Sequence, residues 1–173
     1  MVAAVLVSSC AMDMMDYDIV RTYDEYGNEV CWLDFADTCL RRCFEEAVGV
    51  PRDGLFPVEG IAALTKLDCS GRGIVSLGGI RNFPNLDTLI CDNNKLESID
   101  FNLIPSVRHL SCAGNRISEM NLCGANLQSL RCSPMNDGKG RNLLKFIYLY
   151  RNQEIPDLIV PDETFIIELP RAE

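Results

Sequence analysis

Four cysteines at nearly constant spacing constrain the fold of this chain more than any other feature. They stand 22, 21 and 20 residues apart, at Cys69, Cys91, Cys112 and Cys132. Each ends the same motif: leucine or valine, two variable residues, leucine, one variable residue and cysteine. A period of about 20 residues predicts a repeat protein, in which short units stack and share one continuous core. Such regularity does not indicate a disulfide framework or a metal cage.

The residues that follow each cysteine repeat less strictly. Three positions later the second and third units carry Asn94 and Asn115, whereas the first carries Arg72 and the fourth Met135. An asparagine side chain at a turn can satisfy buried backbone groups, so we expect a short asparagine ladder of two members. The fourth unit loses its second half at 133–142.

This pattern resembles the leucine-rich repeat, L-x-x-L-x-L-x-x-N/C-x-L, with cysteine in the third apolar position. The match is strong over residues 64–132. The resemblance implies an α/β repeat fold: a right-handed leucine-rich-repeat solenoid with a parallel β-sheet on its concave face, a helical N-terminal cap and a β-rich C-terminal cap. The four repeat cysteines would then form an inward ladder of small buried side chains.

Segments on both sides of the repeats have the patterns of caps. Residues 35–48 predict an amphipathic helix with Asp37 as its N-cap and Gly49 at its end, and a second short helix is expected over 57–62. Together with the first repeat, these helices resemble the N-terminal cap of internalin-type bacterial proteins. Residues 143–173 are rich in β-branched and aromatic side chains, which predicts a last strand and an extended or hairpin cap.

The first ten residues are apolar, then small, and end at a cysteine. The run LVSSC at 6–10 resembles the lipobox of bacterial lipoprotein signal peptides, although 1–10 contain no lysine or arginine. The resemblance implies lipidation of Cys10 and a secreted, extracytoplasmic protein at the outer membrane or cell surface. The expected division of the chain is a signal segment at 1–10, an acidic tether at 11–33, the helical cap at 34–63, the repeats at 64–142 and the C-terminal cap at 143–173.

The nine cysteines leave one pairing question open. Cys39 and Cys43 stand one helical turn apart, and they either pack in the core or one of them pairs with Cys31. No C-x-x-C motif occurs, so neither a metal site nor a cofactor is expected.

Composition argues against most enzymes and against a nucleic-acid partner. The chain has one histidine, and a triad of His109 with Ser111 and Asp92 would lie in a row on an open sheet without oxyanion donors. The net charge of −9 disfavours polyanions. No apolar run approaches the ~18 residues of a membrane span. We therefore expect a non-enzymatic monomer that meets a membrane only through a lipid on Cys10.

The outward positions of the repeat strands are the candidate binding surface, because a preformed concave face suits a protein or glycan partner. The alternative is a structural, envelope-interaction lipoprotein with no dedicated ligand. Apolar side chains on the sheet would favour the first function, and an apolar solenoid end the second. The candidate partner-binding residues are Lys66, Asp68, Thr88, Ile90, Asp92, His109, Ser111, Ser129 and Arg131.

Overall fold

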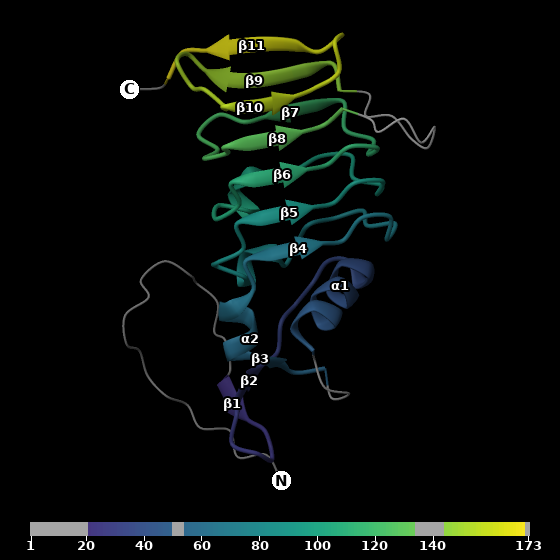
Figure 1. Ribbon diagram of the computed structural model, residues 1–173, viewed down its shortest axis with the longest axis vertical. Coiled ribbons are helices and arrows are strands. Elements are labelled where there is room, and N and C mark those ends of the chain that lie inside the picture. Colours follow the sequence, from purple (N-terminus) through teal and green to yellow (C-terminus); the bar gives the residue numbers. More distant parts are fainter. Residues whose placement is uncertain (1–20, 50–53, 134–143, 172–173) are drawn as a thin grey trace.

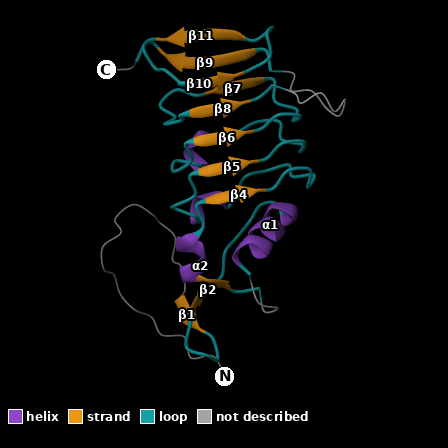
Figure 2. Cartoon of the chain, in the orientation of Figure 1, coloured by secondary structure: helices purple, strands orange, loops and turns teal. Residues whose placement is uncertain are grey.

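The computed structural model describes residues 21–49, 54–133 and 144–171. The chain forms a β-solenoid of short parallel strands with two helices at its N-terminal end (Figures 1 and 2). Cys10 and its lipobox-like segment lie outside the described residues. None of the described helices has the length and apolar character that crossing a bilayer requires.

A small antiparallel sheet occupies the N-terminal end, where the sequence predicted part of an acidic tether. The sheet order is β1-β2-β3, and residues 24–28 turn between the first two strands around the side chain of Asp24. Val30, Cys31 and Leu33 are buried, which explains why this segment folds despite its acidic surface. The strands are β1 (Arg21–Tyr23), β2 (Glu29–Cys31) and β3 (Phe56–Pro57).

Helix α1 (Thr38–Val48) begins and ends where the sequence predicted. The side chain of Asp37 accepts from the backbone N–H groups of Cys39 and Leu40, and Gly49 ends the helix in the left-handed conformation at φ +76°. It packs against β3 and the first repeat strand, and Val48 at its end lies close to Gly60 of the second helix, α2 (Val58–Ala63). Both helices therefore contribute to the same core as the repeats.

Five parallel strands form the main sheet of the solenoid, which we call the long sheet. They pair in the order β10-β8-β6-β5-β4, with equivalent motif positions side by side. The middle residue of each strand is a leucine that faces the core, and all but Leu158, which is partly buried, are buried. The strands are β4 (Lys66–Asp68), β5 (Thr88–Ile90), β6 (His109–Ser111), β8 (Ser129–Arg131) and β10 (Asp157–Ile159).

A second parallel sheet lines the last three turns of the solenoid, and the sequence did not predict it. The first two turns return through 3₁₀ helices at Ile80–Asn82 and Phe101–Leu103. The next three return through strands that pair in the order β11-β9-β7. These strands are β7 (Glu119–Asn121), β9 (Phe146–Tyr150) and β11 (Phe165–Leu169).

The C-terminal segment differs from the predicted hairpin alternative. Strand β10 pairs parallel with β8 in the long sheet, and β11 pairs parallel with β9 in the second sheet. Together β10 and β11 make one more solenoid turn. A hairpin needs antiparallel neighbours, so this segment extends the solenoid and does not fold back on it.

The four repeat cysteines line the interior, each with no exposed surface. The thiols of Cys69 and Cys91 donate to backbone carbonyls on the next turn at 3.3 Å, and the Sγ atoms of Cys112 and Cys132 lie 3.3 Å apart. Burial raises the pKa of Cys69 to about 12. The contact with Cys132, together with burial, raises the pKa of Cys112 as well. These thiols are therefore packing groups and not nucleophiles.

The predicted asparagine ladder is confirmed. Asn94 and Asn115 are buried, and the amide nitrogen of each donates to carbonyls of its own turn and of the preceding one. The amide oxygen of Asn94 accepts from the N–H groups of Arg72 and Ile74, while that of Asn115 accepts from Leu96. Each asparagine thus joins adjacent turns through backbone groups that would otherwise be unpaired.

Candidate binding surface

The outward side chains of the long sheet form two straight rows, which we call the long-sheet face. The register of the strands places equivalent residues side by side about 4.8 Å apart. One row is Lys66, Thr88, His109, Ser129 and Asp157. The other is Asp68, Ile90, Ser111, Arg131 and Ile159.

Eight of the nine residues predicted for partner binding lie on this face. The ninth, Asp92, follows the end of β5, where the alternation of the strand no longer holds. It is only 9% exposed, and its Oδ1 accepts from the N–H of Ala113 and from the hydroxyl of Ser111, both at 2.8 Å. Asp92 therefore holds the neighbouring turn and presents little surface to a partner.

Strand β10 adds Asp157 and Ile159, two face residues that the sequence prediction missed. The hydroxyl of Ser129 donates to Oδ2 of Asp157 at 2.9 Å, and Ile159 is exposed. The signal was present in the chain, because Ile155, Leu158 and Val160 repeat the spacing of the motif. The motif was missed because Val160 stands at the position that cysteine occupies in the other units.

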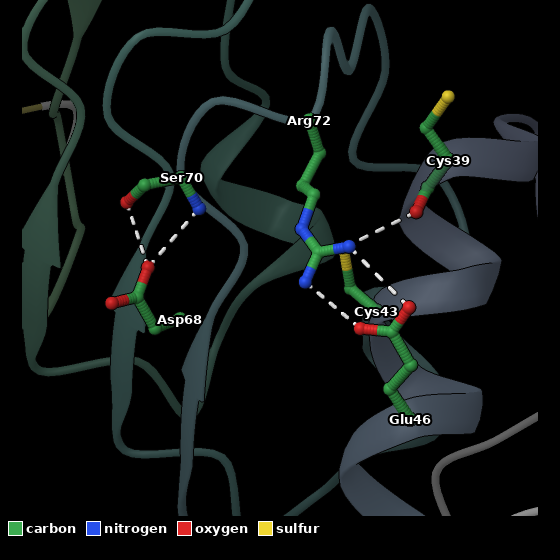
Figure 3. Close-up of polar contacts among 6 residues, drawn as sticks. All are labelled: Cys39, Cys43, Glu46, Asp68, Ser70 and Arg72. Carbon is green, nitrogen blue, oxygen red and sulfur yellow. Dashed lines mark hydrogen bonds and ion pairs between the residues drawn. The ribbon is translucent and has the colours of Figure 1, made fainter.

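Polar contacts hold several face residues in place. The hydroxyl and N–H of Ser70 both donate to Oδ1 of Asp68, at 2.7 and 3.0 Å (Figure 3). These hydrogen bonds lower the pKa of Asp68, so its carboxylate stays charged. In the same row as Asp68, Arg131 carries the opposite charge. The second row of the face therefore carries both charges with an isoleucine beside each.

Asp87, just before β5, is a further polar residue beside the face. Its carboxylate accepts from the hydroxyl of Thr88 at 3.2 Å and lies 3.9 Å from both Nε of Arg108 and Nε2 of His109. Among the described contacts, His109 faces Asp87 whereas Ser111 bonds Asp92. A nucleophile–base pair between His109 and Ser111 is therefore not assembled.

A second polar cluster joins helix α1 to the first repeat turn (Figure 3). The guanidinium of Arg72 forms a two-pronged ion pair with Glu46, at 2.8 and 3.3 Å. The thiol of Cys43 donates to the carbonyl of Cys39, and burial raises the pKa of Cys43 despite nearby Arg72. Both Cys39 and Cys43 are free thiols, so neither forms a disulfide with Cys31. The ion pair in this cluster therefore joins helix α1 to the first repeat turn.

Within 21–49, 54–133 and 144–171, no three side chains of histidine, cysteine, aspartate or glutamate gather as metal ligands. Two shallow hollows occur away from the long-sheet face, one around Lys95, Glu97 and Arg116 and one around Tyr150 and Arg151. The face itself is open, which suits contact with a large partner better than enclosure of a small substrate.

No protein-family model matches the chain, and no curated protein is similar to it in sequence. Solved structures similar to it include the CBM51-2 and INT domains of Clostridium perfringens ZmpB, at 22% identity and TM-score 0.42, over 52% of this chain and 20% of that one. Internalin C2 of Listeria monocytogenes matches at 18% identity and TM-score 0.43, over 69% of this chain and 66% of that one. Internalin InlF of the same organism matches at 19% identity and TM-score 0.38, over 67% of this chain and 44% of that one. The chain thus spans less than two thirds of each.

Proposed function

We propose that this chain is a non-enzymatic binding module, a right-handed leucine-rich-repeat solenoid capped by α1 and α2, whose concave long-sheet face recognises a protein partner. One observation carries the proposal: five in-register strands hold ten outward side chains in a preformed array. Preorganised side chains cost little conformational entropy on binding. Ile90 and Ile159 supply apolar contact within an otherwise polar surface, and Asp68 and Arg131 supply charges of both signs.

The size of the face limits the affinity it can support alone. Five strands of three residues span about 20 Å by 10 Å, whereas a standard interface covers roughly 800 Å² on each partner. The partner must therefore also touch residues beside the strands, such as Asp87 and Arg108. A short peptide segment or a glycan chain lying across the strands would fit the face by itself.

A binding experiment tests this function with matched variants. The purified chain is probed against extracellular protein and glycan arrays, alongside Ile90→Arg on the face and Lys95→Glu on a distant loop. We expect a discrete ligand that Ile90→Arg weakens at least tenfold and Lys95→Glu leaves unchanged. Equal loss with both variants, or no ligand for the folded wild type, contradicts recognition through the long-sheet face.

A structural protein without a dedicated ligand is the second candidate, because the last described turn of the solenoid carries an apolar surface. Nine large hydrophobic side chains are exposed among the described residues, and five of them lie on β9, β10 and β11. Under this alternative the array screen finds no ligand, and the chain instead associates through its C-terminal end.

We further propose that Cys10 carries a lipid and that the solenoid lies outside the cytoplasm, at the outer membrane or cell surface of a bacterium. The lipobox-like run at 6–10 supports this location. Protease treatment of intact producing cells should release peptides from 34–173, and Cys10→Ala should abolish incorporation of a labelled fatty acid. Protection of those peptides until the envelope is broken would contradict surface display. Fatty-acid labelling that persists in Cys10→Ala would contradict lipidation at this cysteine.

A further inference from the structure

Strand β11 is the last strand of the described residues, and among them one of its edges has no neighbour. It lies at the opposite extreme of the molecule from α1 and β1, and in its sheet it pairs only with β9 (Figure 1). Phe165 is 66% exposed and Ile166 is 50% exposed, and the rings of Phe165 and Phe146 stack at 6.0 Å. An exposed apolar edge strand is a template for another strand.

The ladder with β9 determines which backbone groups point outward. The N–H of Phe165 donates to Lys145, and the carbonyl of Leu169 accepts from Arg151. In a parallel pair, every second residue of a strand directs both its N–H and its C=O toward the neighbouring strand, and the residues between direct theirs to the other side. Phe165, Ile167 and Leu169 therefore face β9, and the N–H and C=O groups of Ile166 and Glu168 face outward.

We propose that β11 pairs with β11 of a second copy of this chain, antiparallel and about a twofold axis at Ile167. In this register Ile166 exchanges two hydrogen bonds with Glu168 of the second copy, and the symmetric pair supplies two more. Phe165 lies opposite Leu169 of the second copy, so the exposed apolar side chains cover one another. The chain would then be a dimer, in place of the monomer that the sequence predicted.

The charges at the two ends of β11 favour this antiparallel arrangement of two identical strands. Asp162 and Glu163 precede the strand, whereas Arg171 follows it and Arg151 lies beside its end. The twofold axis places Glu163 opposite Arg171 of the second copy, and this pair forms twice. A parallel arrangement would set like charges together.

Sedimentation of the full chain over a range of concentrations tests the pairing. We expect a reversible monomer–dimer equilibrium that Ile166→Lys weakens at least tenfold. The matched control is Val75→Lys, since Val75 is also exposed, at 60% against 50% for Ile166, but lies in the first repeat turn, near α1. A monomer at every concentration overturns the proposal, as does a dimer that Ile166→Lys leaves intact or Val75→Lys weakens equally. Both variants replace exposed side chains, and circular dichroism checks that each remains folded.

Cross-linking and charge exchange then test the register. Under mild oxidation Ile167→Cys should form an intermolecular disulfide within the tryptic peptide 152–171, which contains no native cysteine, whereas Ile166→Cys should not. Glu163→Arg or Arg171→Glu alone should weaken the dimer several-fold, and the two changes in one chain should restore it. A disulfide at position 166 instead, or no restoration by the double exchange, contradicts a twofold axis at Ile167. Neither result bears on ligand recognition by the long-sheet face.

Discussion

At the scale of the residue, Asp37 shows how one side chain can join two kinds of structure. Its Oδ1 caps helix α1, while its Oδ2 accepts from the N–H groups of Val75 and Ser76 in the first repeat turn. The first turn has no preceding turn to pair with, so the cap residue of the helix supplies its acceptors. Burial alone would raise the pKa of Asp37, but the backbone donors outweigh burial and hold its pKa below 3.8.

This lowered pKa gives a prediction about pH. At pH 7, Asp37→Asn should lower the free energy of unfolding by about 2 kcal/mol, because the amide nitrogen cannot accept and leaves N–H groups unpaired. The stabilisation by the carboxylate is present above the ordinary pKa of 3.8 and is lost as pH falls through the lowered pKa. The difference between wild type and variant should therefore shrink below pH 4. Urea unfolding at several pH values measures it.

The control for Asp37 is Asp100→Asn, because Asp100 also caps a short helix but is exposed, and among the described contacts its side chain bonds only Asn102. This variant should change the unfolding free energy by less than about 1 kcal/mol. If the difference between wild type and Asp37→Asn does not vary between pH 7 and pH 3, the carboxylate is not the group that joins the helix to the repeat.

The asparagine ladder supplies a second prediction at this scale. Asn115→Ala removes an amide that bonds three backbone carbonyls and one N–H in the interior, so it should destabilise the fold by about 3 kcal/mol. Asn121→Ala is the matched control, since Asn121 is exposed and, among the described contacts, its side chain accepts only from the N–H of Cys123. Equal effects in thermal unfolding would show that the buried amide contributes no more than an ordinary turn side chain.

At the scale of the element, each solenoid turn is one strand of the long sheet plus a return segment. The strand is only three residues long and buries a single central leucine, so it has no stability of its own. Neighbouring turns supply the rest through paired strands, cysteine packing and the asparagine amides. The stack is therefore the smallest unit that can bury these apolar side chains.

The packing of the cysteines predicts their reactivity. Cys69, Cys91, Cys112 and Cys132 have no exposed surface, and burial raises the pKa of Cys91 well above its usual value. A thiol reagent should leave these four unlabelled in the folded chain and label them in denaturant. The internal controls are Cys39 and Cys123, which are partly exposed and should react without denaturant. Mass spectrometry of the peptides reads each site, and rapid labelling of all four would refute the buried ladder.

The sequence predicts the turns that keep the full motif and misses those that do not. Spacing alone identified four strands of the long sheet and helix α1, because apolar periodicity reports which side faces the core. Strand β10 was missed because its motif ends with Val160 in place of cysteine, and Val160 lies 28 residues beyond Cys132. The second sheet depends on pairing between distant return segments, which local patterns do not encode. Asp92 was misplaced for a related reason, since alternation fails where a strand turns.

At the scale of the whole molecule, the helices and the repeats share one hydrophobic core. Phe44 of α1 stacks on Phe83 of the first return segment, with ring centroids 3.8 Å apart, and Phe35 and Phe56 surround them. Buried residues continue from this aromatic cluster to Ile155 without a break. Each turn of such a stack contacts only the turns next to it. When these contacts are strong, the whole stack unfolds as one unit.

The single tryptophan makes this cooperativity measurable. Trp32 lies at the N-terminal end and is exposed, with the guanidinium of Arg41 5.6 Å from the centre of its ring. Its fluorescence therefore reports on the helical end, whereas circular dichroism reports on the whole chain. We expect both signals to change at the same urea concentration. An earlier transition of the fluorescence would show that the helical end unfolds by itself.

A substitution far from Trp32 tests whether the two unfolding signals report one cooperative transition or two transitions that happen to coincide. Leu130 lies fully buried in β8, three strands away from β4, and Leu130→Ala should cost about 3 kcal/mol through the cavity it leaves. If the core is continuous, this loss must lower the urea midpoint seen by Trp32 as much as that seen by circular dichroism. Ile159→Ala, on the exposed side of β10, should move neither signal appreciably. A tryptophan transition that stays at its wild-type midpoint in Leu130→Ala would divide the solenoid into two separately folding parts, with the boundary between β4 and β8.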